Sequence, residues 1–150
     1  MLRVLVIDDE NHVRAAVTTA LKAKGYDVRA FATGPLGLRA FDEAQFGVKF
    51  DVAIVDVFML EMDGMTTIKA LRDRAPALPI VVMSGGDYGS TVLEILPSAP
   101  NLSGVACLQK PFRPHQLVQA IEEAIGKAPP SRQAEPKTAR RHRAAFASAR

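Results

Sequence analysis

Residues capable of phosphate chemistry follow several separate apolar segments of the chain. The pair Asp8-Asp9 follows residues 2–7, and Asp56 ends the segment 50–56. Ser84 ends the segment 79–84, and Lys110 comes shortly after residues 105–108. Such short apolar segments are typical of strands that are buried on both faces of a parallel sheet. Because reactive groups in open parallel sheets lie beyond the carboxyl ends of the strands, we expect these side chains to share one edge.

Asp8, Asp9 and Asp56 at one sheet edge would repel one another and raise one another's pKa unless a cation joined them. Mg²⁺ is the expected cation, because it is typically held by one or two carboxylates together with water and phosphate oxygens. With the metal bound, Asp56 could act as a nucleophile toward phosphorus. The metal and Lys110 would stabilise the charge of the transferring phosphoryl group, and the Ser84 hydroxyl would donate to one of its oxygens. These residue types are those that aspartyl phosphorylation requires.

Each of these residues alone has an ordinary structural explanation. An Asp-Asp pair before a helix often caps it, and an acid that ends a strand often forms a turn. Ser84 beside two glycines and Lys110 beside a proline are typical of loops. Their arrival in order, each at a predicted strand end, favours one common site.

The segments that would position these residues alternate between strands and helices. We expect strands at residues 2–7, 26–31, 50–56, 79–84 and 105–108. We expect five helices. The first begins at the cap Asn11 and stops at Gly25, the second begins at residues 33–35, and the third follows Gly64. The fourth lies around residues 90–96, and the last runs from Pro114 to Gly126. The alternation predicts an α/β fold with a doubly wound parallel sheet.

The basic residues are concentrated near the C-terminal end. Residues 1–126 hold 12 Lys and Arg against 15 Asp and Glu, a net −3, while residues 127–150 hold 7 against 1, a net +6. We expect residues 1–126 to form one domain and residues 127–150 to be a basic, disordered tail. The basic run 140–143 could bind nucleic acid or an acidic partner, but a solvated tail is the preferred interpretation.

The single cysteine, Cys107, cannot form an internal disulfide, which fits a reducing cytoplasm. No apolar run approaches the roughly 20 residues of a membrane-spanning helix. We therefore expect a cytoplasmic protein with no membrane insertion.

The strand-end residues lie in stretches that resemble the motifs of response regulator receiver domains, including single-domain chemotaxis-type regulators. The resemblance covers about residues 2–126 and rests on Val6-Ile7-Asp8-Asp9-Glu10, Ile54-Val55-Asp56, Met62-Asp63-Gly64-Met65, Val82-Met83-Ser84-Gly85 and Lys110-Pro111-Phe112. It implies a flavodoxin-like (βα)5 fold with strand order 2-1-3-4-5. It also implies that a histidine kinase or a histidine phosphotransfer protein donates a phosphoryl group to Asp56.

The resemblance assigns metal ligands and a switch. Asp9 and Asp56 would bind Mg²⁺ directly, Asp8 through water, and Phe58 through its backbone carbonyl. Ser84 would be the switch hydroxyl, Lys110 the counter-charge of the phosphate, and Lys110-Pro111 a cis peptide. The signal would pass to a protein partner through the face of the 90–96 helix, the 105–108 strand and the last helix, or the phosphoryl group would be relayed onward.

Two residues depart from the family's pattern. Cys107 stands three residues before the lysine, where the family usually has an aromatic side chain, and is expected to be an inert core thiol rather than a redox sensor. Phe58, two residues after Asp56, would hinder the attacking water. We therefore expect a phosphoaspartate that lives longer than in fast chemotaxis regulators; a half-life of seconds would contradict this.

Three other functions compete with that of a signalling switch. A phosphohydrolase of the haloacid-dehalogenase kind would place a second Asp where Phe58 stands, and a flavin carrier would need a Ser/Thr/Gly phosphate loop after the first strand. Nucleic-acid binding would rest on the tail alone and is not expected. The preferred interpretation is a signalling switch that catalyses only its own phosphorylation and dephosphorylation, not an enzyme acting on other substrates.

Overall fold

The computed structural model describes residues 1–59, 62–85 and 104–127. Its elements are β1 (Arg3–Ile7), α1 (Asn11–Ala23), β2 (Asp27–Phe31), α2 (Gly34–Ala44), β3 (Val52–Asp56), α3 (Gly64–Arg74), β4 (Ile80–Ser84), β5 (Ala106–Gln109) and α5 (Pro114–Lys127). The helix predicted around residues 90–96 and most of the predicted tail lie outside the described residues. None of the helices within the described ranges is long and apolar enough to span a membrane.

The five strands form one parallel sheet in the order β2-β1-β3-β4-β5, which confirms the predicted flavodoxin-like fold. The register places Ile7 opposite Val55, so β1 and β3 end almost level with each other. Ser84 at the end of β4 lies opposite Gln109 at the end of β5. The strand ends that carry the predicted site residues therefore meet at one edge of the sheet.

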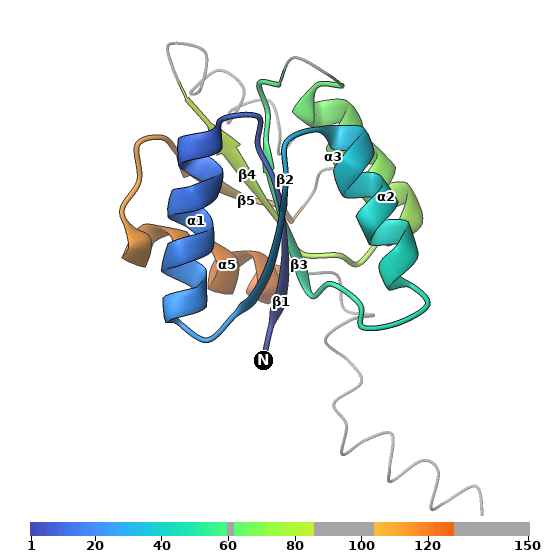
Figure 1. Cartoon of the computed structure of the whole chain (residues 1–150), viewed down its shortest axis with the longest axis horizontal. Helices are drawn as coiled ribbons and strands as arrows, with labels where there is room; N and C mark the ends of the chain where they lie inside the picture. The colour runs from blue at the N-terminus through green and yellow to red at the C-terminus, as the bar shows by residue number, and fades with distance from the viewer. Residues whose placement is uncertain (60–61, 86–103, 128–150) are drawn as a thin grey trace, which may run out of the picture.

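The helices cover both faces of the sheet, with α1 and α5 on one side and α2 and α3 on the other (Figure 1). Successive strand residues point to opposite faces, which divides the core into two layers. In β1, Val4 and Val6 pack toward α1 and α5, whereas Leu5 and Ile7 pack toward α2 and α3. Burial on both faces explains why the strand sequences are continuously apolar rather than alternating.

Two of the expected helix ends are confirmed. Gly25 adopts the left-handed backbone conformation, with φ of 85°, directly after the α1 C-cap. That conformation is nearly free of strain only for glycine, so the residue ends the helix. The Thr33 hydroxyl caps α2 by accepting a hydrogen bond from the Leu36 amide.

Two other expected ends are wrong. Asn11 is the first residue of α1 rather than its cap, and its side-chain oxygen accepts from Arg14 instead of from a helix amide. The turn before α1 is held by Asp8, which accepts from the Glu10 amide at 2.9 Å. The last helix runs through Gly126 to Lys127, because Gly126 does not adopt the left-handed conformation that would end it.

Candidate functional site

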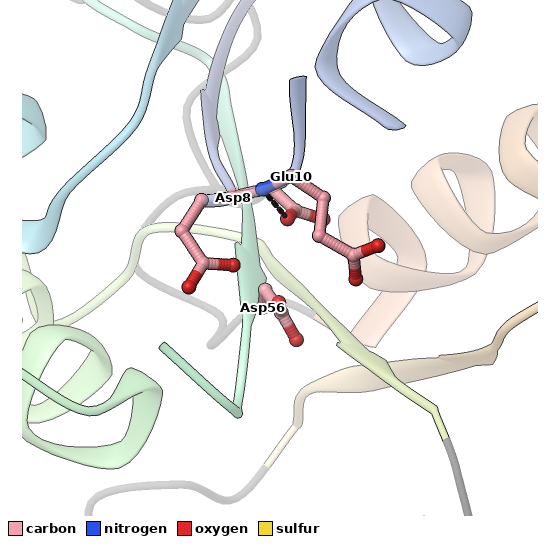
Figure 2. A group of neighbouring side chains, drawn as sticks. Asp8, Glu10 and Asp56 are labelled. Atoms are coloured by element: carbon pink, nitrogen blue, oxygen red, sulfur yellow. Dashed lines mark hydrogen bonds between the residues drawn. The ribbon is translucent and has the colours of Figure 1, made fainter. Parts of the chain in front are cut away.

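Four acidic residues meet at the carboxyl ends of β1 and β3. Asp8, Asp9, Glu10 and Asp56 each offer one carboxylate oxygen, and these oxygens all lie within 4.8 Å of one another. Figure 2 shows Asp8 and Glu10 converging on Asp56 from the turn that follows β1. Asp8 is fully buried and Asp56 is 2% exposed. The structure thus brings together the three aspartates predicted from sequence.

Lys110 supplies the positive charge of this acidic cluster. Its Nζ lies 2.8 Å from Asp8 Oδ2, 3.3 Å from Asp56 Oδ2 and 3.2 Å from Glu10 Oε1. Lys110 directly follows β5, which pairs with β4 and ends level with Ser84 at the same sheet edge. The backbone fixes this loop, since the Lys110 amide donates to the Ser84 carbonyl at 2.7 Å.

The environment of Asp56 raises its pKa to about 6 from an ordinary 3.8. Burial is the largest cause, and the negative charge of Asp8 adds to it. Lys110 and the Phe58 amide, which donates to Asp56 Oδ1 at 3.2 Å, act in the opposite direction. Asp56 therefore remains mostly ionised at neutral pH, yet its carboxylate is poorly solvated and basic.

Burial disfavours the ammonium form of Lys110, but its contacts with Asp8, Asp56 and Glu10 together outweigh burial. The pKa of Lys110 is therefore raised above its ordinary value, and the side chain stays positively charged. A fixed cation beside a basic carboxylate is the arrangement that a developing phosphoryl charge requires.

Ser84 ends β4 beside these groups and is fully buried. Its hydroxyl oxygen has no hydrogen-bond partner among the described residues. Buried hydroxyls without a partner are uncommon, because burial removes the hydrogen bonds that water would supply. The hydroxyl is therefore available to a group that enters the site.

Gly64 lets the start of α3 approach the backbone of Asp56. A Cβ at position 64 would lie 2.1 Å from the Asp56 carbonyl oxygen and 2.4 Å from Val57 Cα. The Gly64 amide donates to the Val57 carbonyl at 2.9 Å, and the Asp63 side chain caps α3 by accepting from the Thr66 amide. Val57, directly after Asp56, and Asp63, directly before Gly64, are thus both held by hydrogen bonds to the start of α3.

A pocket of about 510 Å³ opens above Asp56 and Lys110, and Phe58, His12 and Phe112 form part of its wall. Phe58 is 44% exposed, so it stands at the mouth of the pocket rather than inside the core. Asp56 is consequently buried from the bulk yet reachable from outside through this opening.

The donor set of the cluster suits a hard cation, because every candidate ligand is a carboxylate oxygen. Mg²⁺ fits this set better than a softer metal, which would favour sulfur or imidazole. The predicted ligand role of the Phe58 carbonyl stays a prediction. Glu10 is the member that the sequence reasoning did not assign; its place directly after Asp8-Asp9 was the available signal.

Cys107 is half-buried in β5 and packs with the core layer of α2 and α3. Burial raises the pKa of its thiol, which disfavours the reactive thiolate. This is in keeping with the expected inert thiol. His12 and His115 are exposed.

Comparison with known proteins places this geometry in a family. The family model "Response regulator receiver domain" matches residues 4–122. The chain belongs to the response regulator receiver domain family. Members of this family act as signalling switches, and the matched range contains every site residue described above and every strand residue except Arg3.

Two curated relatives are longer proteins, which the chain matches over part of their length. The chain is 32% identical to the sensor kinase CckA of Brucella abortus over 83% of its own length and 12% of that protein. It is 31% identical to the transcriptional regulatory protein FixJ of Bradyrhizobium diazoefficiens, over 88% of its own length and 60% of that protein. The chain thus spans less than two thirds of the length of each of these two relatives.

Among solved structures, the chain is similar to the chemotaxis protein CheY4 of Vibrio cholerae. The TM-score is 0.68 at 29% identity, and the match covers 83% of this chain and 98% of the other. The match therefore spans nearly the whole of that chemotaxis protein.

Proposed function

We propose that Asp56 accepts a phosphoryl group from a histidine kinase or a histidine phosphotransfer protein, in a reaction that depends on Mg²⁺. The observation that carries the proposal is the contact of Lys110 with Asp56 and Asp8 inside a cluster of four carboxylates. Lys110 and the three aspartates each have a part in the proposed phosphorylation, and the pocket above them is open to a donor.

In the proposed reaction an Asp56 carboxylate oxygen attacks phosphorus, and the bond from phosphorus to the donor nitrogen breaks. Asp56 needs no proton acceptor, because at neutral pH it is mostly ionised despite a pKa of about 6. Lys110 holds the phosphoryl oxygens, and Asp8, Asp9 and Asp56 would hold the metal. When bound, Mg²⁺ supplies charge that draws the carboxylates together and stabilises the phosphoryl oxygens.

After transfer, the phosphoryl group adds negative charge next to Lys110 and Ser84. The Ser84 hydroxyl, which has no partner among the described residues, would donate to one phosphoryl oxygen. A shift of the Ser84 backbone would move Lys110 as well, because the Lys110 amide donates a 2.7 Å hydrogen bond to the Ser84 carbonyl. We propose that this movement alters the face that includes β5 and α5 for a protein partner, or that the phosphoryl group is relayed onward.

A phosphohydrolase is not favoured, because Phe58 lacks the acid or base that such an enzyme needs two residues after its nucleophile. The proposed protein thus changes only its own phosphorylation state. The unpaired Cys107 supports a location in the reducing cytoplasm.

Intact-mass spectrometry after incubation with acetyl phosphate and Mg²⁺ tests the proposal. We expect the wild-type chain to gain one phosphoryl group, and Asp56→Asn or chelation with EDTA to prevent the gain. Asp73→Asn, which removes an exposed carboxylate of α3, is the matched control and should be phosphorylated normally. Equal phosphorylation of wild type and Asp56→Asn would overturn the assignment.

A further inference from the structure

A second concave region lies along the β2 edge of the sheet and shares no lining residue with the pocket above Asp56. We call it the α2–β2 groove, of about 560 Å³, and it is lined by Arg3, Arg29, Phe31, Leu36, Arg39, Ala40, Glu43, Ala44, Gly47, Val48 and Phe50. Its lining comes from β1, β2, α2 and residues 47–50.

Helix α2 carries two separate stripes. Gly34, Gly37, Leu38 and Phe41 face the core and are buried. The groove stripe is Leu36, Arg39, Ala40, Glu43 and Ala44, whose spacing is that of one continuous helix face. Leu36 is 50% exposed and Val48, on the opposite rim, is 70% exposed. An apolar contact surface is therefore left open toward solvent.

The charge of the groove opposes that of the domain around it. Arg3, Arg29 and Arg39 line the groove against Glu43, and Asp27 pairs with Arg3 beside it, so three positive charges face two negative ones, a net +1, whereas residues 1–126 carry a net −3. Arg39 is paired with Glu43 at 3.2 Å. A local positive potential on an acidic domain selects a negatively charged ligand.

Two arginines of the groove are held differently. Arg3 lies 4.8 Å from the centre of the Phe50 ring and 3.2 Å from Asp27, so its guanidinium is fixed. The side chain of Arg29 is exposed and makes no hydrogen bond or ion pair with any described residue. The groove thus offers one positioned cation and one unpaired cation on the same sheet face.

The strand beside the groove has an open edge. Within the described part of the chain, β2 is hydrogen-bonded to β1 alone, and its other edge has no neighbouring strand. An extended polypeptide can use such a backbone edge, whereas a small anion cannot. The combination of a strand edge, apolar rims and net positive charge selects a protein segment.

We propose that the α2–β2 groove docks an extended, acidic segment of a partner protein. Carboxylates of the segment would pair with Arg29, and its apolar side chains would cover Leu36 and Val48. This surface differs from the proposed output face at β5 and α5. Docking here does not depend on the proposed phosphorylation, so Asp56→Asn should bind the segment as the wild type does.

A displayed library of random twelve-residue peptides, selected on the full chain, tests this proposal. We expect enrichment of peptides that combine Asp or Glu with Leu, Ile, Val or Phe. Arg29→Glu should weaken their binding about tenfold or more, because it replaces an attraction by a repulsion. Lys22→Glu, an equal charge change on exposed α1 across the sheet, is the matched control and should leave binding unchanged. Leu36→Ser should weaken binding without reversing charge.

The proposal is overturned if no acidic peptide is enriched over an unrelated bait. It is also overturned if enriched peptides bind Arg29→Glu as well as they bind the wild type. The same holds if Lys22→Glu weakens peptide binding as much as Arg29→Glu does. The chain could also dimerise, with the dimer abolished by Arg29→Glu. The groove would then bind a second copy of the chain, and the proposed partner segment would be overturned. Circular dichroism of each variant verifies that the fold is kept.

Discussion

Asp56 has to be ionised to attack phosphorus, yet it lies where ionisation is disfavoured. Burial and the neighbouring Asp8 raise its pKa to about 6, while Lys110 limits the rise. The outcome is a carboxylate that is charged at neutral pH but more basic than a surface aspartate. A more basic carboxylate is a stronger nucleophile, so the burial that costs stability serves the proposed chemistry.

The raised pKa of Asp56 predicts how stability changes with pH in the metal-free chain. The folded chain binds a proton at Asp56 below about pH 6, whereas an unfolded Asp releases it above its ordinary 3.8. The contribution of Asp56 to the stability of the wild type therefore falls as pH rises between these values, and Asp56→Asn lacks this contribution. We expect the variant's advantage to grow across this window to roughly 1–3 kcal/mol and to stay level above it.

Urea unfolding of both chains in EDTA, at a series of pH values through the window, measures this difference. Asp73→Asn is the control for removal of a carboxylate from an exposed position. A difference between wild type and Asp56→Asn that stays constant or shrinks as pH rises would contradict the electrostatic account.

Lys110 is predicted to stabilise the fold most strongly when no metal is present. Lys110→Met leaves Asp8 and Asp56 buried without a counter-charge, which should cost about 3 kcal/mol at neutral pH in EDTA. Millimolar Mg²⁺ should return a large part of that stability by replacing the lost positive charge. Lys69→Met, on the exposed face of α3, should be neutral in both buffers. If Lys110→Met in EDTA had the same urea midpoint of unfolding as the wild type, this role would be contradicted.

At the scale of elements, the site depends on how closely α3 approaches the end of β3. Gly64 contacts the backbone of Asp56 and Val57, where the atoms belong to the main chain and cannot rotate away. The contact sets the course of the segment that carries Phe58 past the carboxylate. A glycine is therefore required here for space rather than for an unusual φ.

Two glycine substitutions should change stability in opposite directions. Gly64→Ala would place a Cβ 2.1 Å from the Asp56 carbonyl oxygen, so we expect a loss of about 1–3 kcal/mol and weaker phosphorylation. Gly126→Ala meets no atom within 4 Å and lies in the last turn of α5, so it should stabilise the chain by up to about 0.5 kcal/mol. Thermal unfolding of the two variants gives the comparison, and equal effects would refute the close-approach argument.

Sequence reasoning located the strands and their terminal residues because strand burial on both faces leaves a continuous apolar signal. The convergence of Asp8, Asp9 and Asp56 followed from strand direction alone. Helix ends were less predictable: Asn11 and Gly126 are suitable residue types, but each end depends on local backbone geometry. The role of Glu10 depends on the reach of Lys110 across the sheet, which sequence spacing does not encode.

At the scale of the whole molecule, the charge of the chain and its folded core are separate features. Residues 1–127 hold 13 Lys and Arg against 15 Asp and Glu, a net −2, so the positive net charge of the chain comes from residues 128–150. Every residue of the acidic cluster, Lys110 and both core layers lies within residues 1–127. Phosphate capture and the basic segment should therefore be separable.

A chain truncated after Lys127 is predicted to fold and to be phosphorylated by acetyl phosphate to the same extent as the full chain. Truncation after Arg113 removes α5, whose Leu117, Ile121 and Ala124 are fully buried, and should abolish folding. Circular dichroism and intact-mass spectrometry check both forms. Loss of phosphorylation in the 1–127 form would show that the basic segment takes part in phosphate capture.

The central claim is that the phosphoryl group is carried by the carboxylate of Asp56. Borohydride reduces an acyl phosphate of aspartate to homoserine, so reduction after reaction with acetyl phosphate and Mg²⁺ marks the acceptor permanently. Peptide mass spectrometry should then find homoserine at position 56 and unmodified aspartate at positions 8 and 9. Homoserine at position 8 or 9, or at no position in a phosphorylated sample, would contradict the account.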